Sequence, residues 1–400
     1  MRRRRCLGRR HRMPCRSSNV TRPARPPRIA LVRQRYTAFG GAERFTHRIL
    51  GQLAEQGASV SVIARQWQAD PRFTWLKTDP PGRGRLQRDR RFHQAVCAQA
   101  AHFDLIQSHE RIACCDIFRA GDGVHAEWLQ QRARLRGAWS GWLSTLSGYH
   151  RYTLAQERSM LRSTRLKAVI CNSLRVKAEF QRHYAVPDDT LRVIYSGIDP
   201  DVFNPTVRSQ LRAEQRRVLR LGADQPLVVL VGSGFERKGV ARLLKAARAM
   251  TTAVHIAVIG QDRRSATYRA LARALGMADR VRFTGPLNDV RPWLAAADMF
   301  CLPTLYDPFP NSVLEALAMG LPTITSHQSG ATDLLRHAEH AFLVDALDIA
   351  GLTSALETLC DAAARQRIGA AGHQAVKHLT LTATADAMRS LYETVLTPSP

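Results

Sequence analysis

The chain has 400 residues, and its 59 lysines and arginines exceed its 33 acidic residues, which gives a net charge of +26. Hydrophobic residues make up 45% of it, enough to build the cores of about two domains at roughly 100–200 residues each, so a wholly disordered basic protein is excluded. No stretch approaches the roughly 20 apolar residues of a membrane-spanning helix.

Two features indicate where the chain resides. Residues 1–27 contain ten arginines, no acidic residue and no apolar core of a secretory signal, so we expect a disordered leader. The eight cysteines form no Cys-x-x-Cys pair, and several lie in apolar runs, as is typical of free buried thiols. Together these features predict a protein of the reducing cytoplasm.

From residue 28 onward, short apolar runs alternate with amphipathic helical segments. This alternation predicts an α/β fold in which strand-helix-strand units build parallel sheets. Several runs are rich in Val and Ile without interruption, as strands covered on both faces should be. The predicted strands are 28–33, 59–64, 104–107, 168–171, 192–195, 227–232, 255–259, 280–283, 298–302 and 322–325.

The alternation is interrupted near residue 200, which divides the chain into two halves. We expect an N-terminal Rossmann-like domain over 28–200, a linker over 201–220 and a C-terminal Rossmann-like domain over 221–380. The last segment, 381–400, has a helical pattern. Parallel-sheet domains bind ligands at the carboxyl ends of their strands, so the chemistry is expected in the loops that follow strands.

Two of these loops carry glycines or cations that suit phosphate. Gly40 and Gly41 precede a predicted helix, whose free N–H groups favour an anion, although a Gly-Gly pair also suits an ordinary turn. Arg237 and Lys238 follow the strand at 227–232, and two adjacent cations can neutralise a diphosphate; a solvated charged turn is the alternative. The Lys-Ser/Thr pair of an ATP-binding P-loop is absent there, so that site is excluded.

A proline-rich loop leads into a predicted helix that starts near Asn311. The N–H groups of Asn311, Ser312 and Val313 would suit an anion, while the carboxylates of Asp307 and Glu315 would suit sugar hydroxyls. A purely structural interpretation is also open, in which Asn311 caps the helix and Glu315 interacts with the helix dipole.

Two loops in the N-terminal half carry His109, Asp122 and His125. Such polar groups could face a hydroxyl of a second substrate, and histidine suits proton transfer near neutral pH. A lone histidine is more often structural. We take His109 and Asp122 as the candidate catalytic residues.

The motifs described above, and their order along the chain, resemble those of the retaining GT-B-fold glycosyltransferases of family 4, the glycosyl transferases of group 1. The resemblance covers roughly residues 28–396. In the family's E-x7-E motif this chain has Asp307 in place of the first glutamate, which makes the sugar less certain than the nucleotide. The matching motifs are Gly40-Gly41, the segment 194–199, Arg237-Lys238-Gly239, Asp307 with Glu315, and the run 315–322.

The resemblance implies a fold, a donor and a set of roles. Two Rossmann-like domains face each other across a cleft, the helix in 381–400 crosses back to the N-terminal domain, and a UDP-sugar binds without a metal or other cofactor. The Asp-x-Asp at 199–201 lies in the crossover segment and is not expected to bind metal. The implied donor contacts are Gly40 and Gly41 with diphosphate and sugar, Arg237 and Lys238 with diphosphate, Asp307 with the sugar, Glu315 with the ribose, and Asn311, Ser312 and Val313 with an anionic group.

Within that family the chain most resembles the lipopolysaccharide core glucosyltransferases that add the first glucose to the inner-core heptose. This implies a lipid-linked glycan acceptor, glucose from UDP-glucose, and a peripheral position on the inner face of the inner membrane. Transfer of another sugar to a capsule or exopolysaccharide lipid intermediate is the alternative.

The segment between Glu127 and Glu157 contains no acidic residue and mixes arginine with tryptophan. Its apolar residues recur with a period near 3.5, which predicts a helix face that either docks on an anionic membrane or packs as a lid on the protein. Nucleic-acid binding is the rival explanation of the charge, but no such motif is present, and no specific nucleic acid is expected. The residues concerned are Arg132, Arg134, Arg136, Arg151, Trp128, Leu135, Trp139, Trp142, Leu146 and Tyr149.

Overall fold

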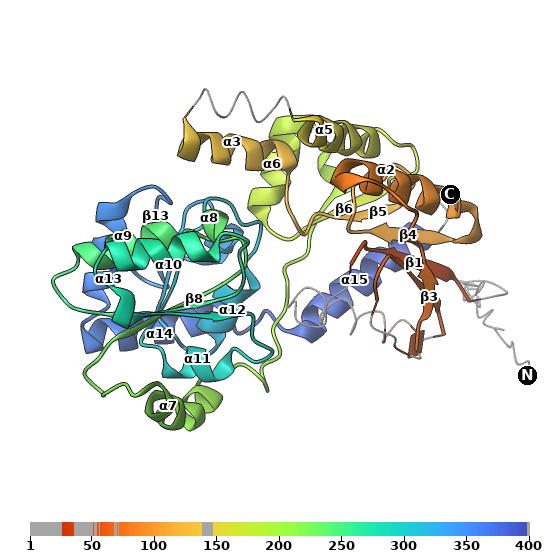
Figure 1. The fold of residues 1–400 in the computed structure, drawn as a ribbon. Helices are drawn as coiled ribbons and strands as arrows, with labels where there is room; N and C mark the ends of the chain where they lie inside the picture. Colours follow the sequence, from red (N-terminus) through yellow and green to blue (C-terminus); the bar gives the residue numbers. More distant parts are fainter. Residues whose placement is uncertain are drawn as a thin grey trace, which may run out of the picture.

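The computed structural model describes residues 26–35, 51, 54, 55, 57–67, 70, 72–137 and 147–397. Within them the chain forms two parallel sheets, each with its own helices, in two domains that stand side by side (Figure 1). The predicted α/β class with two parallel-sheet domains is confirmed. The leader 1–25 and the Gly40-Gly41 loop lie outside the described residues.

The N-terminal sheet has the strand order β3-β2-β1-β4-β5-β6-β7, and every adjacent pair is parallel. Its central strand β1 pairs with β2 on one side and β4 on the other, and Leu31 and Val32 in it are fully buried. The strands are β1 (Arg28–Val32), β2 (Ser59–Ala64), β3 (Thr74–Lys77), β4 (Leu105–Ser108), β5 (Ile117–Arg119), β6 (Ala168–Cys171) and β7 (Leu191–Val193).

Helices cover both faces of this sheet because its strands are apolar on both sides. One face packs against α2, α5 and α6, for example through Phe92 and Met160. The other face packs against the C-terminal helix α15, through Met388 and Tyr392, so the end of the chain joins the N-terminal domain (Figure 1). The helices are α2 (Gly84–Cys97), α3 (His125–Arg136), α5 (Gly148–Leu161), α6 (Leu174–Tyr184) and α15 (Leu381–Leu396).

The C-terminal sheet has the order β10-β9-β8-β11-β12-β13, again parallel throughout. Its strands are β8 (Leu227–Val231), β9 (His255–Ile259), β10 (Val281–Gly285), β11 (Met299–Leu302), β12 (Thr323–Ser326) and β13 (Phe342–Val344). Its helices are α8 (Phe235–Lys238), α9 (Val240–Ala249), α10 (Ser265–Ala274), α11 (Arg291–Ala296), α12 (Asn311–Ala318), α13 (Ile349–Thr358) and α14 (Ala362–Val376).

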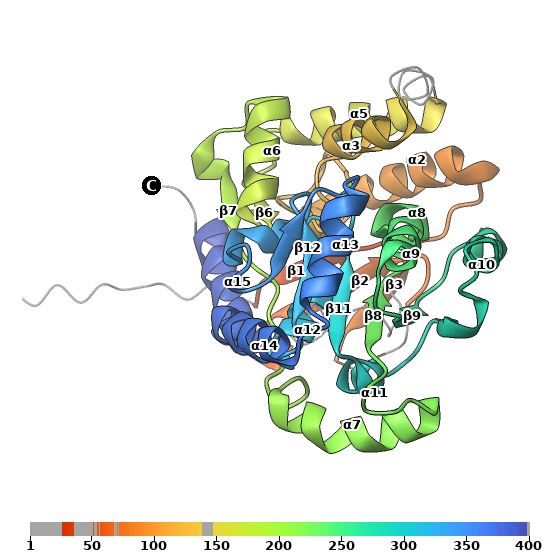
Figure 2. The same ribbon diagram turned by 90° about the vertical axis from the view of Figure 1, so that its left-hand side faces the viewer.

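The segment expected as a linker, 201–220, contains a helix, α7 (Pro205–Leu219), that packs on the C-terminal domain. Asn204 caps it by accepting a hydrogen bond from the N–H of Val207 at 2.8 Å. Arg212 donates to the carbonyl of Ala297 at 2.7 Å, at the end of α11. The helix lies at the end of the molecule away from α3 and α5 (Figures 1 and 2).

All ten predicted strands are present, with ends shifted by at most two residues. Three strands were not predicted. β5 and β13 have three residues each, too short for a periodic pattern, and β3 is a mostly exposed edge strand.

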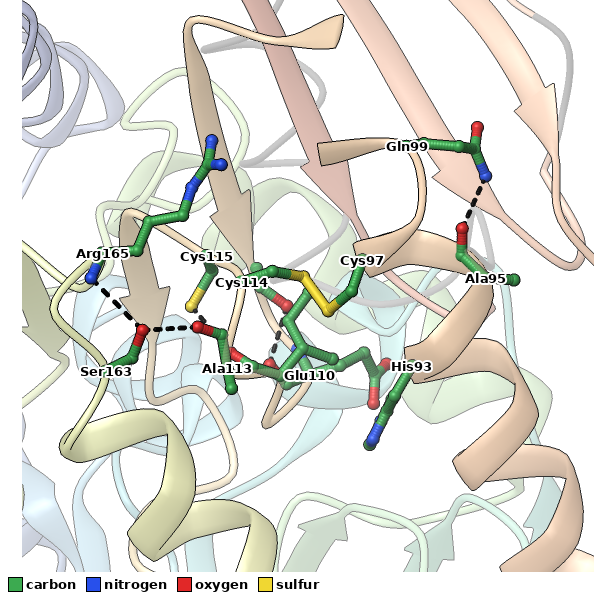
Figure 3. Close-up of a disulfide and its surroundings, with 12 residues drawn as sticks. His93, Ala95, Cys97, Gln99, Glu110, Ala113, Cys114, Cys115, Ser163 and Arg165 are labelled. Carbon is green, nitrogen blue, oxygen red and sulfur yellow. Dashed lines mark hydrogen bonds between the residues drawn. A yellow bond between two sulfur atoms is a disulfide. The ribbon is translucent and has the colours of Figure 1, made fainter. Parts of the chain in front are cut away.

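The cysteines correct one expectation. Cys171 and Cys301 are free and buried in strands, as predicted, but Cys97 and Cys114 form a disulfide (Figure 3). The pair joins the end of α2 to the loop between β4 and β5, across 17 residues of sequence. Because no short motif marks such a pairing, only the fold brings the two thiols together.

We expect Cys114→Ser to lower the free energy of unfolding of the oxidised protein by about 3 kcal/mol, because the disulfide closes a loop in the unfolded chain. The measurement is urea denaturation with and without dithiothreitol. Cys360→Ser, at a half-buried free cysteine, is the matched control. An equal loss for Cys114→Ser in dithiothreitol would mean that the serine, and not the missing bond, destabilises the protein.

Candidate active site

A cavity of about 890 Å³ opens between the two domains. It lies at the carboxyl ends of strands of both sheets, where open parallel sheets bind ligands. Residues that follow β1, β2, β4 and β5 line one wall, including Gln34, Arg65, His109 and Asp122; Lys238, Asp307 and Asn311, which follow β8 and β11, line the other.

The loop after β8 is built around glycines. Gly239 has φ +85°, and a Cβ there would stand 2.1 Å from the carbonyl oxygen of Pro303. A Cβ on Gly232 would stand 2.8 Å from the stem of Lys238. The loop can therefore press against β11 and aim Lys238 at the cavity only with glycine at both positions.

Lys238, Arg237 and Asp307 form one cluster. The Lys238 ammonium donates a hydrogen bond to Asp307 Oδ2, and Arg237 Nη1 lies 3.5 Å from the same oxygen. Lys238 is 8% exposed, and burial lowers its pKa, although the negative charge of Asp307 opposes the shift. Residues predicted to serve separate parts of the donor are thus in direct contact.

Arg237 stands beside the cavity and does not line it. Its Nη1 donates to the carbonyl oxygen of Tyr306 at 3.2 Å, and its side chain is 35% exposed. Of the two predicted cations, Lys238 is the one that faces the cavity directly.

The helix α12 begins at Asn311, as predicted, but Asn311 does not cap it. Pro310 occupies the cap position, and no side chain caps this end. Ser312 Oγ donates to the carbonyl of Val231 at 3.0 Å, which ties the helix to the end of β8. The N–H of Val313 donates to the carbonyl of Pro310 at 3.0 Å, so the prediction that it is free for an anion is wrong.

Glu315 lies in the second turn of α12 and is 8% exposed. It does not line the cavity, whereas Asn311, four residues earlier on the helix, does.

His109 lines the cavity at the end of β4. Arg33 Nη1 lies 3.1 Å from His109 Nδ1, and Gln107 Nε2 lies 3.5 Å from His109 Nε2. Because a guanidinium can only donate, Nδ1 accepts the hydrogen bond from Arg33. Burial, together with the positive charges of Arg33 and Arg119, lowers the pKa of His109 well below its usual value. The neutral ring therefore has its lone pair already engaged, which favours a binding role over proton transfer.

Asp122 is exposed and lines the cavity in the turn after β5. The adjacent buried carboxyl of Glu110 accepts a hydrogen bond from the N–H of Gln34 at 3.0 Å, and burial raises its pKa, with Asp122 adding to the shift. His125, in contrast, points away from the cavity toward α5, with Nε2 at 3.1 Å from His150 Nδ1.

Three parts of this cavity were not anticipated from the sequence. They are Arg65 after β2, the start of α2 with Arg85 and Arg88, and Tyr149 at the start of α5. The available signal was the run Pro80-Pro81-Gly82, which is typical of a turn before a helix, followed by closely spaced arginines.

Tyr306 joins the two domains beside the cavity. Its hydroxyl donates to Glu179 Oε2 of the N-terminal domain at 2.6 Å and accepts from the N–H of Val124 at 2.9 Å. Gly123 makes room for it, because a Cβ there would stand 2.1 Å from the hydroxyl.

Burial raises the pKa of Glu179 from 4.5 to about 7, although Tyr306, Arg175 and Arg182 favour the ionised form. Between these values the folded protein keeps a proton on Glu179 that the unfolded chain releases, so the contribution of Glu179 to stability falls as pH rises from about 4.5 to about 7. We expect this contribution to fall by about 3 kcal/mol and to be absent in Glu179→Gln. Urea denaturation across that pH range tests it, with exposed Glu214→Gln as control; an unchanged pH dependence in Glu179→Gln would contradict it.

The apolar residues of 128–149 that were expected to supply a helix face do not lie on one continuous helix. The helix α3 ends at Arg136, before Gly137 with φ +82°, and α5 starts at Gly148. Trp139, Trp142 and Leu146 lie outside the described residues. Tyr149 lies under Arg85, whose guanidinium carbon is 4.1 Å from the ring centroid, and lines the cavity.

In the part of the chain that the structure describes, no helix is both long and apolar enough to cross a bilayer. Nor does that part contain a group of three or more His, Cys, Asp or Glu side chains arranged to hold a metal ion. The Asp-x-Asp at 199–201 forms a turn, in which Asp199 Oδ1 accepts from the N–H of Asp201 at 3.1 Å.

Two family models match the chain, one on each domain. Residues 39–202 match the model of glycosyltransferase family 4, and residues 225–362 match that of glycosyl transferases group 1.

Curated relatives match most of the chain. Lipopolysaccharide glucosyltransferase WaaG of Escherichia coli K12 is 26% identical over 311 residues, 76% of this chain and 81% of WaaG. Lipopolysaccharide core biosynthesis glycosyltransferase LpsE of Rhizobium meliloti is 28% identical over 345 residues, 84% of this chain and 90% of LpsE.

Solved structures share the fold. The crystal structure of WaaG superposes with a TM-score of 0.80 at 23% identity, covering 91% of this chain and 99% of that one. HepE of Anabaena in complex with UDP-glucose superposes with a TM-score of 0.72 at 18% identity, covering 92% and 100%. The chain therefore belongs to the GT-B-fold glycosyltransferases of family 4, the glycosyl transferases of group 1.

Proposed function

We propose that this enzyme transfers a hexose, with retention of configuration, from a UDP-sugar to a lipid-linked glycan, most specifically glucose from UDP-glucose to a heptose of the lipopolysaccharide inner core. The observation that carries the proposal is the cluster in which buried Lys238 and Asp307 line one wall of the cavity and the half-buried Arg237 stands beside them. It presents two cations and a carboxylate where a sugar diphosphate needs both.

The cations have a defined role toward the donor. Lys238 and Arg237 neutralise the diphosphate as the sugar-phosphate bond breaks, which is the stabilisation of developing charge that a metal supplies in other enzymes. Neither a metal nor another cofactor is part of the proposal. The N-terminal end of α12, with Asn311 at the cavity, adds a favourable helix dipole.

The remaining donor contacts follow the family motif. Gly40 and Gly41 approach the diphosphate and sugar, Glu315 holds the ribose, and Asp307 binds the sugar hydroxyls. In the structure Asp307 is paired with Lys238. The diphosphate must therefore replace Asp307 as the partner of the Lys238 ammonium before the Asp307 carboxylate can bind the sugar.

No side chain is needed to take the acceptor proton. In a front-face reaction the acceptor oxygen attacks the anomeric carbon from the side on which UDP leaves, and the departing β-phosphate oxygen accepts the proton. His109 and Asp122 would then orient the acceptor hydroxyl, which suits a neutral, engaged imidazole better than base catalysis does.

The names of the relatives support the acceptor. WaaG is named a lipopolysaccharide glucosyltransferase, and LpsE is named a lipopolysaccharide core biosynthesis glycosyltransferase. We place the enzyme on the cytoplasmic face of the inner membrane, where the basic surface of α3 and α5 meets anionic lipid. No specific nucleic acid is part of the proposal.

The test offers a panel of sugar nucleotides, with UDP, GDP and ADP as the nucleotide, together with lipopolysaccharide truncated at the inner-core heptose, and measures nucleotide release. We expect release from UDP-glucose above every other donor, and NMR of the product should show the α configuration of the donor retained. Preference for another sugar, which the shorter Asp307 allows, would favour a capsule or exopolysaccharide intermediate instead. Sequence-specific nucleic-acid binding without any transfer would overturn the enzymatic assignment.

A further inference from the structure

The two walls of the cavity differ in charge. On the C-terminal wall Lys238 and Arg263 face a single acidic residue, Asp307. The N-terminal wall, on the side of the second substrate, is lined by seven arginines and four acidic residues. This excess is more than a neutral sugar requires, and it lies across the cavity from the cations assigned to the donor diphosphate.

Most of the acids on this wall are already engaged. Asp79 pairs with the buried Arg65, which also donates to the carbonyl of Arg88. Asp89 accepts a hydrogen bond from Gln34 Nε2 at 3.1 Å, and Glu110 accepts from the N–H of Gln34. Seven arginines against four acidic residues leave an excess of three positive charges on this wall, or two when the ion pair of Arg111 with Glu157 is counted.

Two arginines at the start of α2 stand out. Arg85 and Arg88 are three residues apart, on one face of the helix, and both line the cavity. Among the described residues neither makes an ion pair; Arg85 lies over the ring of Tyr149, 4.1 Å from its centroid. Both residues are exposed as well as lining the cavity, so a ligand can reach them.

The N-terminal end of α2, where Arg85 and Arg88 lie, also favours an anion. The 14-residue α2 starts at the cavity, its cap residue Arg83 contributes no side-chain hydrogen bond to the helix end, and its first turn contains no acidic residue. Its positive dipole end is therefore not offset by a carboxylate and adds to the charge of Arg85 and Arg88.

We infer that the acceptor glycan carries an anionic group, a phosphate ester or a carboxylate, close to the hydroxyl that is glycosylated, and that Arg85 and Arg88 bind it. Arginine binds both groups through paired N–H donors. The inference rests on the proposed function, since it names what the second substrate must carry. Arg85 and Arg88 are then specificity residues for the acceptor and leave the donor unaffected.

The experiment uses the full chain and three forms of one probe, the deacylated oligosaccharide of core-truncated lipopolysaccharide. One form is native, one has its phosphate esters removed with hydrofluoric acid, and one has its carboxylates reduced as well. Transfer from UDP-glucose gives KM for each form, and calorimetry gives its Kd. The test variant is the double substitution Arg85→Gln and Arg88→Gln. The control is Arg90→Gln, because Arg90 is an exposed arginine of α2 that does not line the cavity.

We expect removal of the anionic groups to raise KM and Kd of the wild type roughly 10- to 100-fold, as for a lost hydrogen bond to a charged group. The double variant should bind the native form as weakly as the wild type binds the stripped one, with KM for UDP-glucose unchanged, and Arg90→Gln should behave as wild type. Weaker binding of the form without phosphate esters would identify the group as a phosphate. Weaker binding only after the carboxylates are also reduced would identify it as a carboxylate.

Equal affinity of the wild type for all three forms would overturn the inference. So would a double variant that keeps its affinity for the native oligosaccharide but loses binding to phosphatidylglycerol vesicles, because the arginines would then serve lipid phosphate. Calorimetry separates the two proposals: charge-dependent binding without sugar transfer supports the anion site and contradicts only the proposed function.

Discussion

Replacing Lys238 by methionine is expected to lower kcat/KM for sugar transfer about 10²- to 10³-fold, the usual cost of one preorganised charge-stabilising group. Methionine keeps the length and apolar stem that Gly232 accommodates but removes the ammonium. The loss should appear mainly in kcat, because the diphosphate gains negative charge as the sugar departs. Steady-state kinetics with UDP-glucose measures it.

The control is Lys245→Met, an exposed lysine of α9 that does not line the cavity, and it should keep the wild-type rate. Arg237→Ala should lose activity too, but less than Lys238→Met, because Arg237 stands beside the cavity. If Lys238→Met and Arg237→Ala both keep the full rate, the diphosphate site has been assigned to the wrong loop.

Asp307→Asn is expected to lower kcat by about 10²-fold or more while UDP binds at least as tightly as to the wild type. The two effects have opposite signs in the proposed reaction, in which the diphosphate displaces Asp307 from its contact with Lys238 and Asp307 then binds the sugar. Asparagine keeps the shape and a hydrogen-bond acceptor, which limits the damage of leaving the buried Lys238 without its carboxylate.

Calorimetry with UDP and steady-state kinetics with UDP-glucose separate the two effects. A parallel loss of UDP affinity and kcat would mean that Asp307 only holds Lys238 in place and has no contact with the sugar. Asp307→Glu, which restores the residue of the family motif, should keep UDP affinity and is the informative partner variant.

The sequence predicted the sheets well because their strands are long enough and apolar enough to be recognised. Runs such as 227–232 and 255–259 are buried on both faces, so their uninterrupted apolar composition is enough to predict a buried strand. The three-residue strands β5 and β13 exist because neighbouring strands provide hydrogen bonds, β4 and β6 to β5 and β12 to the edge strand β13, and that information is not local.

The C-terminal wall of the cavity was predictable for a related reason. Lys238, Asp307 and Asn311 each follow a strand in short loops with glycine or proline, and the fold places all such loops along one edge. What the loops could not reveal is that Lys238 and Asp307 are in contact, because they are separated by 69 residues.

The N-terminal wall of the cavity depends on contacts that no short motif marks. Arg85 reaches the cavity because α2 starts there, and Tyr149, 64 positions later, is positioned by a different helix. The same holds for Tyr306 with Glu179 and for Cys97 with Cys114, which meet only after both elements have packed. Local sequence patterns thus predict the helices and strands but not the contacts made by single residues at their ends.

The most direct test of the central claim is mass spectrometry of lipopolysaccharide truncated at the inner-core heptose after incubation with UDP-glucose and the full chain. The wild type should add the mass of one hexose, and Lys238→Met should add it far more slowly, whereas Lys245→Met should match the wild type. No added hexose from any sugar nucleotide, or equal addition by Lys238→Met, would contradict the assignment of this cavity as a UDP-sugar transfer site.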